Sequence, residues 1–144
     1  MKIREANLTD ANSLVPLMEQ LGYEVSTPLM QEKLAEFSES ENDIVYVAEH
    51  DKEVLGVITC HITRLFHQSG NAGRITSLAI DEASRGLGVG KNLVREAEQF
   101  FLSLGCVKAE VTSGDQRPKA HQFYENLGYK RNERRFLKQF QQTK

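Results

Sequence analysis

The sequence predicts an α/β fold of the α+β kind, in which helices flank a mixed, mostly antiparallel sheet in the order β-α-α-β-β-β-α-β-α-β. Two features predict this class. Short runs rich in Val, Ile and Thr alternate along the chain with longer segments whose apolar residues recur every three or four positions. The 144 residues, 40% of them apolar, contain no repeat or low-complexity linker, which indicates a single domain over residues 1–144.

An opening strand and two helices are expected first. Residues 2–6 alternate weakly in polarity, as a strand does. Thr9 can accept from the first free amides of a helix that Gly22 ends. Thr27 and Pro28 suit the N-cap and first helical position of a second helix.

Three strands are expected next. Residues 44–48 and 54–60 are β-rich and are separated by the polar segment 49–53, as in an antiparallel hairpin at the centre of the sheet. Residues 74–80 form the third strand, and a glycine-rich turn follows it.

The second half predicts a long helix, a strand, a shorter helix and a closing strand. Apolar residues recur at helical spacing over residues 89–104, and Gly105 ends that helix. Residues 107–111 alternate as a strand does, and a helix is expected over residues 118–128. Residues 135–140 are expected to form the last strand.

Charge and cysteine content exclude several classes of protein. A net charge of −2 gives no global electrostatic reason to bind nucleic acid or an anionic membrane. The amino terminus lacks a secretory apolar run, and no stretch of about 18 apolar residues occurs, so a cytoplasmic protein without a membrane partner is expected. Cys60 and Cys106 lie in apolar stretches without zinc-ligand spacing, which predicts buried, reduced thiols and no metal site.

The turn Arg85-Gly86-Leu87-Gly88-Val89-Gly90 lies between a strand and an amphipathic helix and predicts an anion-binding site. Glycines without Cβ atoms let the backbone fold tightly around an incoming group. Free amides and the positive end of the helix favour phosphate oxygens, and Arg85 adds a cation, so a pyrophosphate fits. The structural alternative is a turn that merely joins strand to helix.

The spacing of this turn excludes two common nucleotide-binding motifs. A Walker A loop requires glycine where Arg85 stands and Ser or Thr where Asn92 stands. A Rossmann turn requires glycine where Lys91 stands and follows a different order of elements.

Two segments resemble the GNAT N-acetyltransferase superfamily. Residues 85–90 match its R/Q-x-x-G-x-G/A motif, and residues 120–129, Ala-His-Gln-Phe-Tyr-Glu-Asn-Leu-Gly-Tyr, resemble its A-x-x-F-Y-x-x-x-G-F/Y segment. Residues 75–80 resemble the strand that precedes the motif. The resemblance covers the second half of the chain and implies the GNAT fold and an enzyme, an acyltransferase that uses acetyl-coenzyme A as cosubstrate.

The resemblance also implies where acetyl-coenzyme A binds. It would lie between residues 76–80 and residues 107–112, with its pantetheine amides on backbone groups of the first strand and its pyrophosphate on the glycine turn. The residues implied for this binding are Leu78, Ala79, Ile80, Arg85, Gly86, Leu87, Gly88, Val89, Gly90 and Lys91.

For the chemistry, the resemblance implies direct attack of a neutral amine on the thioester. Tyr124 would be the general acid for the departing thiolate, since a phenol has a reference pKa of about 10. Many family members carry a strand glutamate as base, but Thr76 and Ser77 offer no carboxylate there. The base stays open among a backbone-held water, Glu110 and no base at all, with His121 as a further candidate.

The acceptor is expected to be a primary amine of a small molecule. Residues 117–124 and 135–138 look like those of aminoalkylphosphonate N-acetyltransferases, and His61, Phe66 and His67 fall where that group has a histidine-containing segment. This resemblance favours an amine that bears an anionic group. The substrate candidates are Ser77, Arg117 and His121, of which Arg117 would meet the anion.

Two other functions stay open from the sequence. One is a coenzyme A-binding regulatory module without catalysis, and the other is acetylation of proteins. A homodimer is plausible because dimers are common in the family and the carboxy-terminal segment is apolar.

Overall fold

Five strands form one sheet in the order in which they occur along the chain. The computed structural model describes residues 1–112, 118–132 and 135–141. The chain divides into two units, Met1–Ser113 and Gly114–Lys144, and the whole sheet belongs to the first. A single domain over the whole chain therefore stays a prediction.

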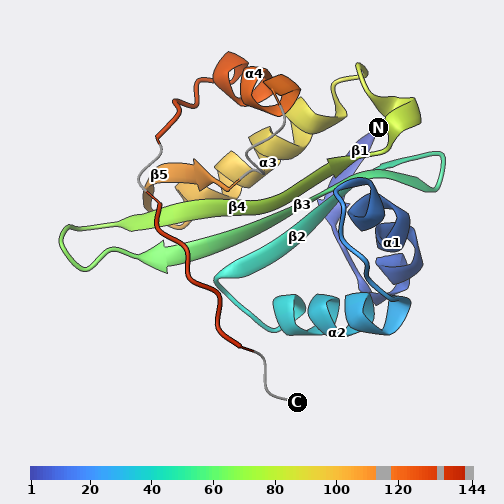
Figure 1. Cartoon of the computed structure of the whole chain (residues 1–144), viewed down its shortest axis with the longest axis horizontal. Helices are drawn as coiled ribbons and strands as arrows, with labels where there is room; N and C mark the ends of the chain where they lie inside the picture. Colours follow the sequence, from blue (N-terminus) through green and yellow to red (C-terminus); the bar gives the residue numbers. More distant parts are fainter. Residues whose placement is uncertain (113–117, 133–134, 142–144) are drawn as a thin grey trace. The chain divides into compact units, whose positions relative to one another are not determined.

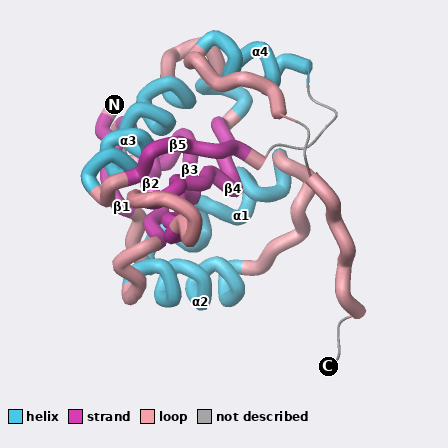
Figure 2. The backbone as a smooth tube through the Cα atoms, turned by 90° about the vertical axis from the view of Figure 1, so that its left-hand side faces the viewer, coloured by secondary structure: helices cyan, strands magenta, loops and turns pink. Residues whose placement is uncertain are grey.

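The first unit is a sheet with helices on both faces. Strands β1 to β4 are antiparallel neighbours, and β5 is parallel to β4 (Figure 1). Helices α1 and α2 lie on one face and α3 lies on the other (Figure 2). The predicted mixed, mostly antiparallel sheet flanked by helices is confirmed. Its elements are β1 (Lys2–Glu5), α1 (Ala11–Gln20), α2 (Thr27–Ser38), β2 (Asp43–His50), β3 (Glu53–Arg64), β4 (Asn71–Ile80), α3 (Val89–Ser103) and β5 (Cys106–Val111).

A 3₁₀ turn that the sequence did not predict lies before the first helix. A 3₁₀ turn over Leu8–Asp10 precedes α1, and Asn7 caps it by accepting from the Thr9 amide at 3.0 Å. The Asp10 carboxylate accepts in return from the Asn7 amide at 2.8 Å, which completes a capping box. The prediction of Thr9 as the cap is therefore wrong, because the residue two positions earlier has the extended backbone that a cap needs.

The cap of the second helix is also earlier than predicted, here by one residue. Ser26, not Thr27, has the extended backbone of an N-cap, and its Oγ accepts from the Leu29 amide at 3.2 Å. Thr27 is the first helical residue, and its hydroxyl donates to Asn12 Oδ1 of α1 at 2.8 Å. Pro28 lies in the first turn as expected.

An ion-pair network fixes the start of α1 to the sheet. Arg4 of β1 donates to both oxygens of Asp10 at 2.8 Å and to Glu49 Oε1 of β2 at 2.9 Å. Asp10 is only 5% exposed. The Arg4 guanidinium therefore holds the pKa of the Asp10 carboxyl below its usual range.

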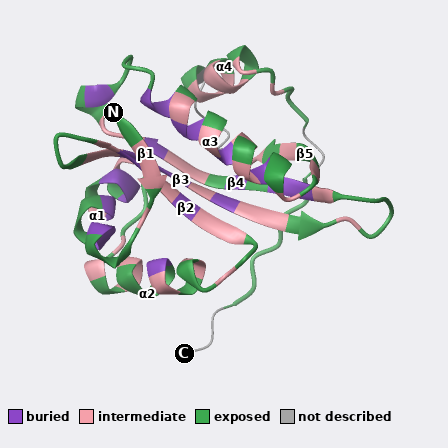
Figure 3. Cartoon of the chain, turned by 180° about the vertical axis from the view of Figure 1, so that it is seen from behind, coloured by how far each residue is buried: buried purple, intermediate pink, exposed green. Residues whose placement is uncertain are grey.

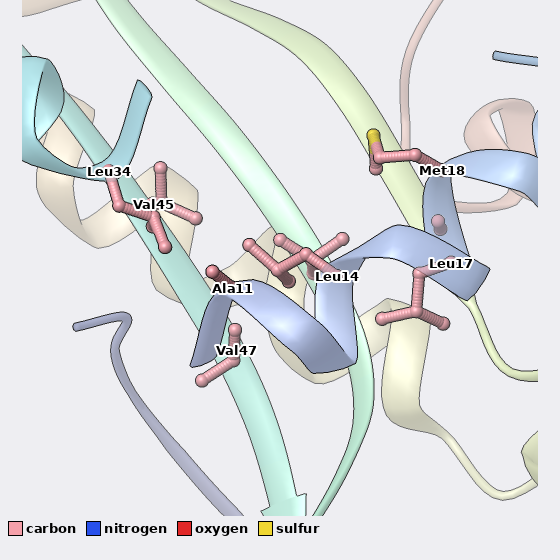
Figure 4. Packing of buried hydrophobic residues seen from close by; sticks show 9 residues of the cluster. Ala11, Leu14, Leu17, Met18, Leu34, Val45 and Val47 are labelled. Carbon is pink, nitrogen blue, oxygen red and sulfur yellow. The ribbon is translucent and has the colours of Figure 1, made fainter. Parts of the chain in front are cut away.

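The core has one apolar layer on each face of the sheet. Figure 3 shows buried positions along the strands and on α1 and α3. Figure 4 shows Leu34 of α2 beside Val45 of β2 and Ala11 of α1 beside Val47, while Leu14, Leu17 and Met18 of α1 belong to the same buried cluster. On the other face, α3 buries Val89, Leu93, Val94, Ala97 and Phe101.

Two expectations for the second half of the chain are wrong. Residues 135–140 form neither helix nor strand. Their apolar side chains, at 136, 137 and 140, do not keep the two-residue period that would give a strand one apolar face. Cys106 is only half-buried because it is the first residue of an edge strand, whereas Cys60 is fully buried and burial raises its thiol pKa to about 12.

Among the residues that the structure describes, no helix has both the length and the apolar character needed to cross a bilayer.

Candidate functional site

The turn between β4 and α3 exposes backbone rather than side-chain surface. Gly86 and Gly88 have φ values of 85° and 80°, which side-chain-bearing residues rarely adopt. Residues 85–88 are exposed, and Val89 begins α3. The first amides of α3 have no acceptor within the helix and carry its positive end, so the turn suits phosphate oxygens.

The strand before the turn has one free backbone edge, as its pairing with β3 shows. The Asp81 amide donates to Leu55 O at 2.8 Å, so that pair exchanges hydrogen bonds across the two strands. Hydrogen-bonded pairs alternate in an antiparallel ladder, which turns the Ala79 amide and carbonyl toward β3 as well. The backbone groups of Leu78 and Ile80 consequently point to the opposite edge.

β5 does not reach that part of the edge. Its pairing with β4 runs only as far as Ile75, opposite Val111, and ends with the Thr112 amide bonded to Ile75 O at 3.1 Å (Figure 1). Among the described residues, no strand pairs with Leu78 or Ile80 on this side. Of the three strand residues that the sequence singled out, these two present free amides and carbonyls, and Ala79 does not.

A pocket of about 200 Å³ lies between the sheet and helices α1 and α2. Most of its wall is apolar, and its polar side chains come from one helix and two strands. The lining residues are Leu14, Met18, Met30, Lys33, Leu34, Phe37, Val45, Val57, Thr59, Thr76 and Ser77. Ser77, a predicted substrate contact, thus lies in a pocket that the sequence did not reveal.

A β-bulge brings two β4 side chains to this pocket. Thr59 pairs with Ser77 and the next β3 residue, Cys60, pairs with Ile75, so Thr76 is an extra residue in β4. A bulge interrupts the alternation of a strand, which explains why the consecutive residues Thr76 and Ser77 both line the pocket. The bulge directly precedes the free edge at Leu78.

A chain of hydrogen bonds crosses three strands and ends at the pocket. The carboxylate Oδ1 of Asp43 on β2 lies 2.8 Å from Nδ1 of His61 on β3. Nε2 of the same ring lies 2.6 Å from the hydroxyl of Thr76 on β4. The hydroxyls of Thr59 and Thr76 are 2.8 Å apart.

The sequence singled out His61 only by family resemblance and did not reveal its partners Asp43 and Thr59, although a signal exists. Thr59 and His61 continue the same alternation as the core residue Val57, and Asp43 does so with Val45. Polar side chains on the core-facing side of two neighbouring strands indicate a site rather than a simple core.

The second unit contains helix α4 (Pro118–Asn126) and the predicted general acid. Tyr124 packs edge-on against Phe123 and Tyr129, with ring centroids 5.2 and 5.9 Å away, and burial raises its pKa to about 12. Arg131 donates to Nδ1 of His121 at 2.9 Å, which gives that histidine a structural partner. Arg117 lies outside the described residues.

Glu110, one of the open candidates for the base, is exposed and pairs with Lys108 at 3.3 Å. It is not among the residues that line the pocket. In the part of the chain that the structure describes, no three His, Cys, Asp or Glu residues lie close enough together to share a metal ion.

Comparison with known proteins supplies the family. The profile described as the acetyltransferase (GNAT) family matches residues 12–129. The aminoalkylphosphonate N-acetyltransferase of Salmonella typhimurium is 28% identical over 138 residues, covering 95% of this chain and 90% of that protein. The glucosamine 6-phosphate N-acetyltransferase of Trypanosoma brucei brucei is 31% identical over 91 residues, 62% of this chain and 60% of that protein.

A solved structure shares the whole fold. A crystal structure described as a transcriptional regulator from Bacillus halodurans superposes with a TM-score of 0.84 at 26% identity, over 96% of this chain and 99% of that chain.

Proposed function

The chain belongs to the GNAT acetyltransferase family, and from that premise we propose that it transfers the acetyl group of acetyl-coenzyme A to the primary amine of a small molecule. The observation that carries this proposal is the free edge of β4 at Leu78 and Ile80, which ends at the glycine turn before α3. One continuous stretch of backbone thus offers amide partners and then a phosphate site.

The residues of this stretch fit the donor in order. The amides and carbonyls of Leu78 and Ile80 match a ligand that itself carries amides, as the pantetheine arm does. The turn amides and the start of α3 suit the pyrophosphate. Arg85 and Lys91 are exposed and add cations beside the turn, where they favour the same anion.

Tyr124 is proposed as the general acid of this reaction. Because burial raises its pKa to about 12, its hydroxyl keeps its proton at neutral pH. The amine attacks the thioester carbonyl directly, and the Tyr124 hydroxyl gives its proton to the departing thiolate. The role rests on the match of residues 120–129 to the family segment.

The pocket under α1 and α2 is proposed to hold the acceptor. It meets β4 at Ser77, one residue before the free edge, so an amine there approaches the donor from the face opposite α3. Lys33 is the one cation among its lining residues. The two curated relatives are named for an aminoalkylphosphonate and for glucosamine 6-phosphate, each an amine with a phosphorus oxyanion. We therefore favour an amine that carries such a group.

A coenzyme A-binding regulatory module is the second candidate. The structural neighbour described as a transcriptional regulator favours it, as does the absence of the family's strand glutamate at Thr76 and Ser77. Acetylation of protein amino groups is favoured by a human relative named N-alpha-acetyltransferase 30, 29% identical over 65% of this chain and 25% of that protein, but a pocket of about 200 Å³ suits a smaller acceptor better.

Two measurements on the purified chain separate these functions. Calorimetric titration with acetyl-coenzyme A is expected to show binding. Thiol release is then followed with aminomethylphosphonate, glucosamine 6-phosphate, an aminoglycoside, a polyamine and lysine as acceptors. Saturable release with the phosphorus-bearing amines, and a product heavier by one acetyl group, supports the enzyme. Binding without release from any acceptor supports the regulatory module, and no binding overturns both.

A further inference from the structure

The hydrogen bonds that join Asp43, His61 and Thr76 have a defined direction. A carboxylate can only accept, so Nδ1 of His61 donates to Asp43 Oδ1 at 2.8 Å. In the neutral ring Nε2 then carries no proton, and the Thr76 hydroxyl donates to it at 2.6 Å. The Thr59 hydroxyl, 2.8 Å from Thr76, is left to donate to the Thr76 oxygen.

Neighbouring groups hold this arrangement in place. The Ser40 hydroxyl donates to the second oxygen of Asp43 at 2.7 Å, which fixes the carboxylate. Phe37 of α2 meets the His61 ring edge-on, with centroids 5.4 Å apart. The imidazole is therefore oriented from both sides, as a histidine needs to be when it takes a proton at one chosen nitrogen.

The Thr76 hydroxyl is the end of the hydrogen-bond chain that lies at the pocket. Thr76 and Thr59 line the pocket, whereas His61 and Asp43 are not among its lining residues. One lone pair of the Thr76 oxygen accepts from Thr59, and the other is available to a donor in the pocket. An amine bound there has N–H groups to give.

We propose that His61 is the base of the acetyl transfer and takes the amine proton through the Thr76 hydroxyl, with Asp43 as the positioning residue. The inference rests on the proposed function and supplies the base that the sequence left open. It uses no carboxylate at the strand position that is occupied here by Thr76 and Ser77.

The step balances as follows. The amine lone pair forms the C–N bond to the thioester carbonyl carbon, and the C–S bond breaks with its electron pair on sulfur. An amine proton passes to the Thr76 oxygen as the Thr76 proton passes to Nε2 of His61. Tyr124 protonates the thiolate and regains a proton from water, and the imidazolium is stabilised by Asp43 until it returns its proton to water.

Charged groups near His61 come from three elements. Asp43 of β2 favours the imidazolium, while Lys33 of α2, on the same pocket, and Arg74 of β4, the strand partner of His61, oppose it. The base must be neutral to accept a proton, so the proposed proton transfer requires an acid limb in the pH profile of kcat at saturating amine.

Two substitutions test the chain of hydrogen bonds. His61→Gln and Thr76→Val are each expected to lower kcat about 100-fold while the Kd for acetyl-coenzyme A stays unchanged. Thr76→Ser keeps the hydroxyl and is expected to recover most of the loss seen with Thr76→Val. His50→Gln is the matched control, because His50 also pairs with an aspartate, at 3.4 Å from Asp51, but at the exposed end of β2.

The pH profile of kcat separates a proton acceptor from a structural residue. With the best amine of the panel, the acid limb of the wild-type profile is expected to disappear in His61→Gln and to persist in His50→Gln. Equal melting temperatures of Thr76→Val and wild type would exclude misfolding, since Thr76 is an exposed strand residue.

The outcomes also distinguish the two proposals. If the wild type turns over an amine and His61→Gln keeps both the kcat and the acid limb, the proton transfer through Thr76 to His61 is overturned. The proposed acetyltransferase activity is not affected by that result. Binding of acetyl-coenzyme A without turnover of any amine overturns the proposed acetyltransferase activity, and with it the proton transfer to His61.

Discussion

The donor side and the acceptor side of the proposed reaction are built from different parts of the chain. The donor side consists of backbone groups from β4 and the start of α3, within residues 78–91. The acceptor pocket consists of side chains from α1, α2, β2, β3 and β4, over residues 14–77. A backbone site tolerates most side-chain changes and depends on chain conformation, whereas a side-chain site changes its ligand with each substitution.

Tyr124→Phe is the strongest test of this comparison, because it shows whether acetyl transfer from the donor also depends on one particular side chain. We expect kcat to fall about 100-fold, because the thiolate loses its acid, while the Kd for acetyl-coenzyme A stays the same. Stopped-flow thiol release and calorimetry measure the two quantities.

Tyr46→Phe is the matched control, because burial also raises the Tyr46 pKa to about 12 but its ring packs on Phe100 of α3. It should retain kcat. An unchanged kcat in Tyr124→Phe would remove Tyr124 from the mechanism.

Asp10→Asn tests how far the acceptor side depends on the ion pair that fixes α1. We expect a loss of about 2 kcal/mol in the free energy of unfolding, because the two bonds from Arg4 lose a charged acceptor at a nearly buried site. Urea denaturation measures it. Glu36→Gln removes an exposed carboxylate of α2, paired with Lys33, and should change stability by less than about 0.5 kcal/mol.

The ion pair between Arg4 and Asp10 also predicts how the free energy of unfolding depends on pH. The pKa of Asp10 is lowered in the folded chain, so its stabilising effect is fully present above the unfolded pKa of about 4 and is lost as pH falls through the folded value. Wild type should therefore lose more stability than Asp10→Asn between neutral and strongly acidic pH. Parallel pH dependence of the two proteins would contradict this role.

Gly86→Ala tests whether the donor side depends on backbone conformation, because the substitution strains the backbone of the turn and adds only a methyl group. With φ at 85° and no atom within 4 Å of a new Cβ, strain is the main effect, at about 1 kcal/mol. We expect the Kd for acetyl-coenzyme A to rise about 10-fold, since the turn amides move from the phosphates.

Gly105→Ala provides the control at the other end of α3. Its φ is 72° and its surroundings are equally open, so it should lose similar stability without any change in the Kd for acetyl-coenzyme A. Equal effects of both variants on that Kd would mean that helix stability, not the turn, controls binding.

The two sides also differ in how well the sequence predicted them. The residue type of Gly86 and Gly88 predicts their positive φ values, whereas the free edge of β4 was implied only by the family resemblance and depends on where β5 ends. On the pocket side only Ser77 was predicted, because the partners of His61 are brought together by strand register, which includes a bulge that no local pattern marks.

The errors in local structure have a similar cause. Thr9 and Thr27 are good caps by type, but Asn7 and Ser26 compete for the same amides, and the extended backbone decides between them. The expected closing strand at 135–140 has β-forming residues without the alternation that a sheet face requires. Residue type thus predicts an element well only where neighbouring residues offer no alternative.

Lys33→Met gives the smallest expected effect and asks whether the acceptor side selects its ligand by charge. The Lys33 side chain is 51% exposed and shared with Glu36, so solvent screens its attraction for an anion. We expect KM for aminomethylphosphonate to rise about 5-fold, with kcat unchanged and with no effect on an uncharged amine. Lys52→Met, in the β2–β3 turn, is the control and should leave both KM values unchanged. An equal rise in KM for charged and uncharged amines would mean that the Lys33 stem shapes the pocket and its charge selects nothing.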